Sequence, residues 1–331
     1  MSASVSIIVV NWNGRHHLQL CLSTLLAQTY PNFEIILVDN GSSDGSQTFV
    51  REHFPSVQLI ELPENVGFAQ GNNVGIRASN AAYIATVNND TKVDPNWLTA
   101  LVETAESNRN VGMCAAKLLF WDQPDVINSA GICLDRAGIA WDRLGGHPNS
   151  REPHAPIPVF GASGGAALYR RTMLDQIGLF DEDFFAYLED VDLAWRARLA
   201  GWDCLYVDTA VIYHHHSATA IEGSPFKNKL LGRNKVWTIV KNYPWPLLLL
   251  YLPAILLYDL GSVAVALLAR RDSSPLVGRL QAIPQLPTMW QKRRKIQQNR
   301  ALPLKEMRAL MEPITTPGQV WQRYQHLAPE Q

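Results

Sequence analysis

The chain has 331 residues, of which 47% are hydrophobic and 18% charged, and its formal net charge is −1. This composition predicts a folded protein with one sizeable core and excludes a disordered chain. Charge is unevenly distributed, because residues 227–308 hold 15 of the 29 Lys and Arg residues but only 3 of the 30 Asp and Glu residues. The rest of the chain is therefore acidic, which argues against nucleic acid as a partner.

The cysteines and the first residues bear on the cellular compartment. The four cysteines are widely spaced, without the pairing of a metal site: Cys21, Cys114, Cys133 and Cys204. We expect buried free thiols, as in proteins of a reducing compartment. The first residues contain neither a basic segment nor a long apolar one, which predicts no secretory signal and a catalytic part that faces the cytoplasm.

The first 90 residues predict a parallel α/β sheet, because short β-branched segments alternate with stretches of helical periodicity. The expected strands are residues 4–10, 33–38, 57–62 and 82–87. Ligands bind beyond the carboxyl ends of the strands in such sheets. Asn11, Asp39 and the sequence Asn88-Asn89-Asp90 each follow a predicted strand, so we expect them to meet at one edge.

The middle of the chain is less regular. Pro95 is expected in the first turn of a helix. Residues 111–160 contain many Gly and Pro residues, which predicts irregular loops rather than a separate domain. Gly164 and Gly165 allow a close approach of the backbone, either to a ligand or to a neighbouring strand.

An acidic cluster begins the next predicted helix. Glu189, Asp190 and Asp192 fall in its first turn, where the helix dipole favours carboxylates whatever the function. Three histidines, residues 214–216, end the following apolar segment, and at most two can face one ligand because side chains alternate along a strand. Together with the earlier acidic turns, this pattern predicts a site for a divalent cation, a nucleoside diphosphate and a general base.

In this order, the segments resemble the family 2 glycosyltransferases of the GT-A fold, in particular their rhamnosyltransferase-like members. The matching segments are residues 7–14, 38–45, 65–69, 88–90, 161–165 and 188–192, with Trp195, Arg196 and Gly201. The similarity spans about residues 4–242. It implies an α/β fold of the GT-A nucleotide-diphospho-sugar transferase type, in which helices flank a mainly parallel sheet.

The resemblance also implies the roles of individual residues. Asp39 would accept a hydrogen bond from the imide of a uracil or thymine base, in a pocket lined by Asn11. The other residues expected on the donor side are Asn65, Gly67, Asn88 and Asn89, although tight packing is an alternative account of the glycine-containing segment. Asp90 is the acidic residue left in the place of the family's Asp-x-Asp motif and is expected to bind Mg²⁺ or Mn²⁺. His214 matches a histidine that binds the metal or diphosphate in some members, with a structural role as the alternative.

Asp190 matches the family's general base, which takes the proton of the acceptor hydroxyl. This implies a metal-dependent, inverting glycosyltransferase that moves a sugar from a nucleotide diphosphate to a glycan or lipid-linked glycan. A rhamnosyltransferase of cell-envelope polysaccharide assembly is one such enzyme. Two alternatives stay open. A nucleotidyltransferase would need a basic, glycine-rich loop in place of residues 11–14, and a catalytically silent sugar-nucleotide or lipid-binding scaffold would not need Asp190.

A long apolar segment follows the region of resemblance. Residues 245–268 contain one charge, Asp259, and are long enough to cross a bilayer, but Pro253, Asp259 and Gly261 interrupt them. Aromatic and basic residues at both ends are typical of interfacial anchors. We expect a pair of helices in one leaflet or a re-entrant hairpin, with a buried helix of a soluble fold as the alternative.

The expected organisation has two parts. Residues 1–242 form the catalytic domain, in which about residues 1–90 bind the nucleotide sugar and residues 91–220 provide the acceptor side and the base. Residues 243–331 form apolar membrane-associated helices and a basic tail, which favours anionic lipid headgroups. The expected location is the cytoplasmic face of the inner or plasma membrane.

Overall fold

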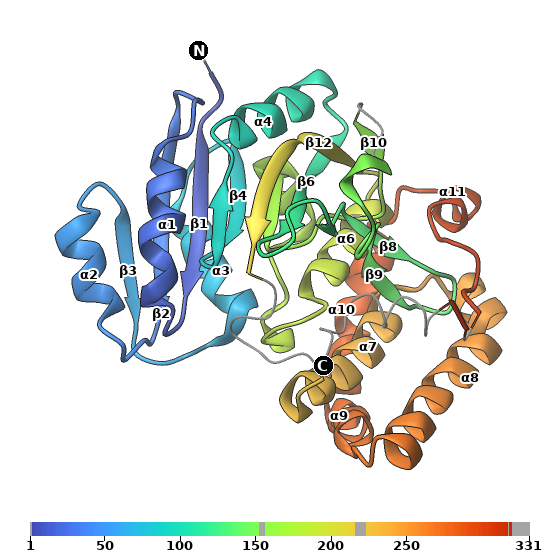
Figure 1. Cartoon of the computed structure of the whole chain (residues 1–331). Helices are drawn as coiled ribbons and strands as arrows, with labels where there is room; N and C mark the ends of the chain where they lie inside the picture. The colour runs from blue at the N-terminus through green and yellow to red at the C-terminus, as the bar shows by residue number, and fades with distance from the viewer. Residues whose placement is uncertain (1, 152–155, 216–222, 317, 320–331) are drawn as a thin grey trace.

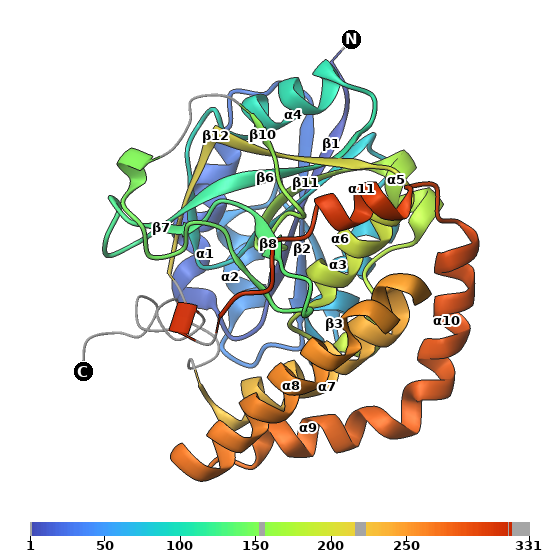
Figure 2. The same cartoon turned by 90° about the vertical axis from the view of Figure 1, so that its right-hand side faces the viewer.

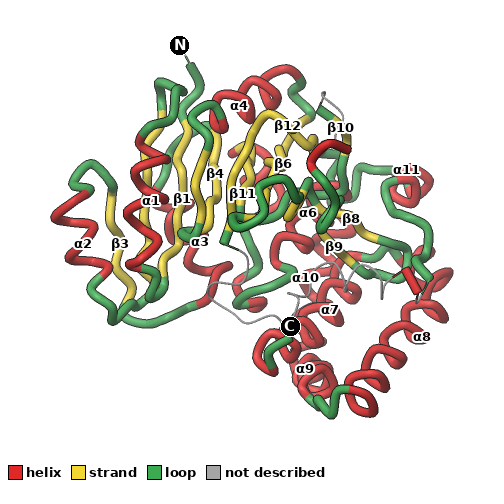
Figure 3. Tube along the Cα trace, viewed as in Figure 1, coloured by secondary structure: helices red, strands yellow, loops and turns green. Residues whose placement is uncertain are grey.

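The computed structural model describes residues 2–151, 156–215, 223–316 and 318–319. Its centre is a ten-stranded sheet with the strand order β10-β12-β6-β11-β4-β1-β2-β3, in which β5 and β7 pair with β12 and β6 (Figure 1). Helices flank the sheet, and further helices near the C-terminus extend from one end of it (Figure 3).

The N-terminal half of the sheet is parallel. Its strands are β1 (Val5–Asn11), β2 (Phe33–Asn40), β3 (Gln58–Leu62) and β4 (Tyr83–Asn88). The connecting helices are α1 (Arg15–Leu26), α2 (Ser46–His53) and α3 (Gly67–Ala78). All four predicted strands are confirmed to within about two residues, the usual uncertainty of an element boundary.

The second half of the sheet is mixed. Its strands are β5 (Thr91–Val93), β6 (Val111–Phe120), β7 (Ile127–Ser129), β10 (Ile157–Pro158), β11 (Ala166–Arg170) and β12 (Asp203–His214). A separate hairpin consists of β8 (Ile132–Leu134) and β9 (Ala140–Asp142). The helices of this half are α4 (Trp97–Ser107), α5 (Arg171–Ile177) and α6 (Glu189–Leu199), with 3₁₀ turns at Asn149–Arg151 and Glu182–Phe184. Strand β11 runs antiparallel to both neighbours, β4 and β6, and so separates two parallel groups.

Strand β6 shows that the prediction of irregular loops is wrong for the beginning of residues 111–160. Nine of its ten residues are buried. A strand covered on both faces reads as a continuous apolar segment without alternation, which is easily overlooked in sequence. Gly112 fits here because a Cβ at this position would lie 2.5 Å from the sulfur of Met173.

Two hydrophobic clusters occupy the two faces of the sheet. Side chains of β1 alternate between them, since Ile8 belongs to one cluster and Ile7 and Val9 to the other. The cluster around Ile8 contains the buried side chains of α3 and α6, and the other contains those of α1, α2 and α4. This sandwich fixes the carboxyl ends of the central strands, where the predicted site residues lie.

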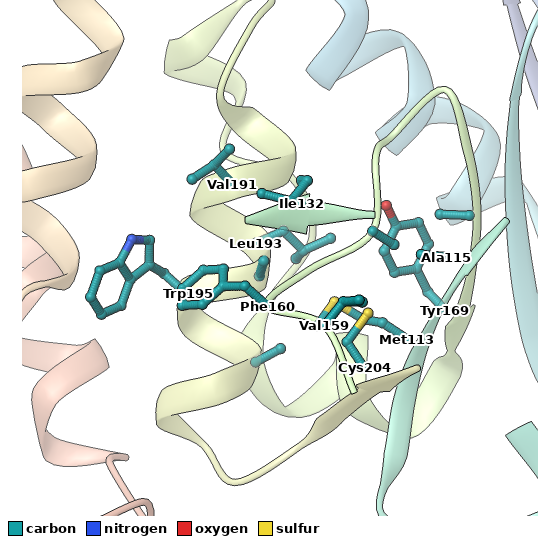
Figure 4. Packing of buried hydrophobic residues seen from close by; sticks show 14 of the residues in the cluster. Met113, Ala115, Ile132, Val159, Phe160, Tyr169, Val191, Leu193, Trp195 and Cys204 are labelled. Atoms are coloured by element: carbon teal, nitrogen blue, oxygen red, sulfur yellow. The ribbon is translucent and has the colours of Figure 1, made fainter. Parts of the chain in front are cut away.

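Helix α6 is held by large buried side chains. Trp195 is fully buried and packs against Phe160 at a ring distance of 5.4 Å, next to Leu193 and Val191 (Figure 4). Replacing such a tryptophan with alanine costs about 3–5 kcal/mol. The helix that carries the predicted base is therefore a rigid part of the core.

The C-terminal part is helical. It consists of α7 (Pro225–Asn242), α8 (Trp245–Ala269), α9 (Ser274–Ala282), the 3₁₀ turn Ile283–Gln285, α10 (Leu286–Gln298) and α11 (Leu304–Ala309). Helices α8 and α9 project from the sheet, and α10 runs back towards α11 (Figure 2). The return is firm, because the amides of Ala301 and Leu302 donate to the carbonyl oxygen of Leu199, and Met307 is fully buried.

Helix α8 corrects the expectation of a helix pair or hairpin, because it is one continuous helix of 25 residues that contains Pro253. The charge that was expected to interrupt it is paired: Arg279 of α9 donates two hydrogen bonds of 2.7 Å to Asp259, and Lys235 of α7 lies 3.3 Å away. The alternative of a buried soluble helix is also wrong, since Leu257, for example, is 70% exposed.

Helices α7 and α9 pack in close contact through glycine. A Cβ on Gly278 would lie 2.0 Å from the carbonyl oxygen of Lys229, and one on Gly232 would lie 2.6 Å from that of Pro275. Neither position can accept a side chain without separating the helices. The projecting helices are therefore joined tightly to α7.

The cysteines are free thiols, as expected. Cys21, Cys114 and Cys204 are buried, and Cys133 is half-buried. Burial raises the pKa of Cys21 and Cys204 to about 12, so these thiols stay protonated at neutral pH.

Candidate active site

The predicted donor residues meet at the carboxyl edge of the central strands. The side-chain amide of Asn89 donates to Oδ1 of Asn11 at 2.8 Å, and the amide of Asn11 donates to Oδ1 of Asp39 at 3.1 Å. Strand register explains the second bond, because Asn11 and Asp39 are paired residues at the ends of β1 and β2. The expected convergence is confirmed, and a continuous hydrogen-bond chain links β2 to the turn after β4.

Asp39 is fully buried, and its carboxylate accepts hydrogen bonds from three groups. Besides Asn11, its donors are the backbone amide of Ser42 at 3.0 Å and the side-chain amide of Gln47 at 2.7 Å. An ionised carboxylate has about four acceptor positions, so these three donors leave capacity for one more. The sequence did not identify Ser42 and Gln47 as partners, although Ser42 lies within the matching segment 38–45 and Gln47 follows two residues after it.

Asp90 lies beside His214 at the end of β12. Oδ1 of Asp90 is buried without a hydrogen-bond partner, and it is 3.3 Å from Nε2 of His214. A buried carboxylate oxygen without a donor is costly, which a cation at this position would relieve. Within the described parts of the chain, no group of three or more His, Cys, Asp and Glu side chains could hold a metal.

The orientation of His214 is set by a residue that sequence reasoning missed. Nδ1 of His214 is 2.9 Å from Oδ1 of Asn128 in β7, so this nitrogen carries the proton and donates it. Nε2 then has the lone pair and faces Asp90 and, at 3.2 Å, the side-chain amide of Asn88. A metal-binding histidine is oriented in the same way by a second hydrogen bond. Asn128 lies in the segment taken for loops, and no sequence signal distinguished it.

The neighbouring histidines lie differently. His215 stacks on Trp121 at a ring distance of 4.4 Å and lies 5.4 Å from His17, while its backbone amide donates to the carbonyl oxygen of Asp90. Burial, followed by the nearby His16, lowers the pKa of His17, so this imidazole is neutral at neutral pH. His216 lies outside the described residues.

Asp190 is the first-turn carboxylate that is positioned to act as a base. Oδ2 accepts a hydrogen bond of 3.0 Å from the amide of Gly164, and Oδ1 accepts one of 2.7 Å from the amide of Val191. The residue is half-buried by its exposed surface, but its carboxylate is surrounded by many protein atoms. Burial, with a smaller contribution from the nearby Asp142, raises the pKa of Asp190 to about 6, against the effect of its two amide donors. A carboxylate with this pKa is ionised at neutral pH and still basic enough to accept a proton.

The other two acidic residues of α6 serve the structure. Asp192 is fully buried, bound to Arg196 at 2.9 Å and Lys241 at 2.7 Å. Burial, followed by the charge of Asp190, raises the pKa of Glu189 well above its ordinary range, which favours the protonated carboxyl group. The helix dipole alone therefore does not explain Asp192, which is the partner of Arg196 and Lys241 in buried ion pairs.

The glycines near the site make close contacts within the protein. A Cβ on Gly164 would lie 3.1 Å from the ring of Phe68, and Gly67 has a φ of +88° with Phe185 so near that a Cβ would lie 2.5 Å from its carbonyl oxygen. Asn65 accepts hydrogen bonds from Asn40 at 3.0 Å and from the amide of Gly67 at 2.9 Å. These contacts agree with the alternative that the glycines of the turn before α3 serve tight packing. Direct contact of Asn65 and Gly67 with the nucleotide sugar stays a prediction.

The family follows from comparison with known proteins. Residues 6–178, slightly more than half of the chain, match the family model described as glycosyl transferase family 2. The chain belongs to this family. The glycosyltransferase is 27% identical over 238 residues to the N-acetylglucosaminyl-diphospho-decaprenol L-rhamnosyltransferase of Mycobacterium tuberculosis, which covers 65% of this chain and 77% of that protein. It is therefore rhamnosyltransferase-like, and the nucleotidyltransferase alternative is excluded.

Solved structures confirm the GT-A-like fold of the glycosyltransferase. Residues 1–349 of TarS from S. aureus superpose with a TM-score of 0.58 at 17% identity, covering 89% of this chain and 88% of that one. The mannosyltransferase PcManGT from Pyrobaculum calidifontis, solved with GDP-Man and Mn²⁺, gives a TM-score of 0.55 at 18% identity and covers 89% and 85%. The family match, rather than these structures, makes the protein a transferase of the nucleotide-sugar-dependent kind, as the sequence predicted.

Proposed function

We propose that this enzyme is an inverting, divalent-metal-dependent glycosyltransferase that moves a sugar from a uridine or thymidine diphosphate to a lipid-linked glycan. The observation that carries the proposal is the carboxylate of Asp190, which accepts from the amide of Gly164 beside the carboxyl end of β4, at the edge of the sheet that holds the hydrogen-bond chain from Asp39 to Asn89. The name of the mycobacterial relative, a rhamnosyltransferase acting on a diphospho-decaprenol, supports L-rhamnose as the sugar.

On the donor side, Asp39 supplies one free acceptor position for the imide N–H of the base, and Asn11 fixes the carboxylate. A carboxylate acceptor favours a base with an N–H donor at that position, because a base that presents only an acceptor there would leave the remaining acceptor position of Asp39 desolvated and unfilled. The neighbouring mannosyltransferase was solved with a guanine nucleotide, whose N1–H could also donate to a carboxylate, so the choice of uracil or thymine rests on the resemblance of the segment around Asp39 to the family.

The metal would be held by Asp90 and His214. The orphaned Oδ1 of Asp90 and the lone pair on Nε2 of His214 fit Mg²⁺ or Mn²⁺, which bind with one or two protein ligands plus phosphate oxygens. The mannosyltransferase solved with Mn²⁺ supports this assignment. When bound, the cation would neutralise negative charge on the leaving diphosphate.

On the acceptor side, Asp190 accepts the proton of the attacking hydroxyl while its two amide donors hold the carboxylate in place. A positioned general base contributes about 10²- to 10⁴-fold to the rate. Attack from the side of Asp190, opposite the leaving diphosphate, inverts the configuration at the anomeric carbon.

The apolar helix α8 would hold the enzyme on the cytoplasmic face of the inner or plasma membrane, where lipid-linked acceptors are concentrated. Over its most apolar 18 residues the mean hydropathy is 2.0 and 17% are buried. Its ends carry Trp245 and Arg270, and Trp245 packs on Trp290 at a ring distance of 5.5 Å. In this division, residues 1–242 perform the transfer and residues 243–331 provide attachment, although α10 and α11 also pack on the catalytic part.

A donor panel tests the proposal. Purified enzyme is incubated with Mn²⁺ and the uridine, thymidine and guanosine diphosphate esters of common hexoses and of L-rhamnose, and nucleoside diphosphate release and thermal stabilisation are measured. We expect both responses with a uridine or thymidine donor, and none after chelation of the metal. A response to guanosine donors alone would contradict the proposed uracil or thymine base, and retention of anomeric configuration in the product would contradict the role of Asp190.

A further inference from the structure

The segment that leads into the catalytic helix has an unusual backbone. Six non-glycine residues have a positive φ in the part of the chain that the structure describes, and three of them precede α6 directly: Phe185 at 64°, Tyr187 at 69° and Leu188 at 65°. This conformation is unfavourable for residues with a large side chain, and it persists only where the surroundings enforce it. We call residues 184–188 the base loop, because Asp190 follows two residues later.

One buried side chain of α7 holds this loop. The side-chain nitrogen of Asn234, which is fully buried, lies within hydrogen-bonding distance of three carbonyl oxygens of the loop, those of Phe184, Ala186 and Tyr187, at 3.0, 2.9 and 2.7 Å, and they share its two N–H groups. Its neighbour Arg233 donates to the carbonyl oxygen of Phe184 at 2.8 Å and to Oδ1 of Asn234 at 3.0 Å. The guanidinium therefore orients the amide so that its N–H groups face the loop.

The opposite side of the base loop contacts the helix of the donor side. The carbonyl oxygen of Phe185 accepts a hydrogen bond of 3.1 Å from the amide of Ala69, and Gly67 lies against the same residue. Residues from α3 and α7, which are far apart in sequence, thus fix the loop from two sides. Asp190 can accept from the amide of Gly164 only if this loop starts the helix in the observed direction.

We infer that Asn234 is a positioning residue for the transfer reaction: it holds the base loop in its strained conformation and thereby directs the carboxylate of Asp190. This inference rests on the proposed role of Asp190 as the base. No sequence motif identified Asn234, which lies outside the family match at residues 6–178. Its partners are main-chain carbonyl oxygens, which a sequence pattern does not reveal.

Asn234→Asp and Asn234→Ala test the inference. Both remove the amide donors, and the first also places a carboxylate against three carbonyl oxygens. We expect the kcat of transfer to fall by about tenfold to a hundredfold, the effect of a small displacement of a catalytic group. Donor Kd should change less than kcat, because none of the hydrogen bonds of Asp39 involves the base loop or α7. The acid limb of the pH profile should move, since the surroundings of Asp190 change.

Counting intact active sites distinguishes a positioning role of Asn234 from a role in stability alone. Calorimetric titration with the nucleoside diphosphate gives the number of intact donor sites, and kcat is expressed per intact site. If Asn234 served stability alone, the number of sites would fall while kcat per site and the pH profile stayed at wild-type values, which would overturn the inference. Asn228→Ala is the matched control on the same helix, because the side-chain amide of Asn228 donates to the carbonyl oxygen of Gly223 and to Asp272, away from the base loop.

Two further outcomes keep the test decisive. If neither Asn234 variant folds, Arg233→Gln, at a half-buried position, weakens the same contacts and should lower kcat per site in the same direction. Wild-type kcat per site in Arg233→Gln would then overturn the inference. If Asp190→Asn is fully active, the proposed base is wrong whatever Asn234 does, so the failure of the proposed function is distinguishable from the failure of this inference.

Discussion

Nε2 of His214 lies 3.3 Å from Oδ1 of Asp90, across the boundary between β12 and the turn after β4. Asn128 holds the imidazole from behind, so the lone pair and the orphaned carboxylate oxygen face the same space. Two residues separated by more than a hundred positions in the chain thus form one potential cation site.

His214→Ala should therefore raise the Mn²⁺ concentration needed for half-maximal transfer by about 10- to 100-fold, the usual effect of disturbing a metal site. The matched control is His215→Ala, whose imidazole stacks on Trp121 instead of facing Asp90. Metal titrations of donor binding and of activity give the two values. Equal effects of both substitutions would show that His214 has no special role at the metal.

Asp39 and Asp90 should separate into a base-binding and a metal-binding function. Asp39→Asn should weaken binding of the free nucleoside diphosphate in EDTA by about tenfold or more, since a hydrogen bond to a charged group contributes about 1.5–3 kcal/mol. Asp90→Asn should leave that binding unchanged and should remove its enhancement by Mn²⁺. Calorimetry with and without metal makes the comparison, and the same loss for both variants in EDTA would refute the division.

Asp190→Asn should lower transfer by about a hundredfold or more while the donor still binds. In the wild-type enzyme, the rate should rise with pH through about 6 and then level off, because the base must be ionised and burial raises its pKa to about 6. A profile of kcat against pH measures this midpoint. Transfer near the wild-type rate in the variant would exclude Asp190 as the base.

The same substitution should stabilise the protein at pH 8. The pKa of Asp190 in the folded state, about 6, is above the ordinary 3.8, so the folded state binds the proton more tightly and loses stability as pH rises from about 4 to about 6. Asn removes the buried charge and this loss. Melting temperatures at pH 4 and pH 8 test the sign: the variant should gain at pH 8 relative to wild type, and a gain at pH 4 alone would contradict the expectation.

Lys241→Met should destabilise the fold by roughly 3–5 kcal/mol, because it leaves the buried carboxylates of Asp181 and Asp192 without their shared cation. Although burial raises it, the charges of Lys241 and Arg196 hold the pKa of Asp192 below its ordinary 3.8. The wild-type network therefore stabilises above about pH 4 and is lost below it. Urea unfolding at pH 7 and pH 3 should show a large difference between the two proteins at pH 7 and a smaller one at pH 3.

Membrane attachment should depend on the exposed leucines of α8. Leu257, Leu260 and Leu268 are 70%, 65% and 84% exposed, and their replacement with Gln should abolish flotation with anionic liposomes. Gln at Leu20 and Leu26, exposed leucines of α1, is the matched control. Wild-type protein that stays at the bottom of the gradient would disprove attachment through this helix.

Local patterns in the sequence predicted much of the donor side. The β-branched segments gave β1 to β4, and the polar residues after them, such as Asn11 and Asp39, meet because parallel strands place their carboxyl ends at one edge. Strand β6 could not be recognised, because burial on both faces removes the alternation that identifies a strand. The continuity of α8 through Pro253 was also hidden, since the ion pair that neutralises Asp259 comes from Arg279 of another helix.

The remaining site residues act through contacts that no local pattern encodes. Asn128 orients His214 from 86 positions away, and Asn234 reaches the base loop about 50 positions earlier. Each depends on the tertiary packing that brings distant segments together. A single sequence can therefore indicate the residues that bind the metal or accept a proton, but it does not reveal the asparagine side chains that orient them.

The contact at Gly278 limits how far the catalytic part can move relative to α8. There is no room for a side chain between α9 and α7, and Asp259 ties α8 to both of these helices. Helix α7 in turn contacts the catalytic helix. On a bilayer that takes up α8, Asp190 would thus operate at a constant height above the lipid headgroups. The enzyme would then select acceptors by the distance of the attacking hydroxyl from the membrane. Shorter and longer glycans would be poorer substrates, whatever lipid carries them.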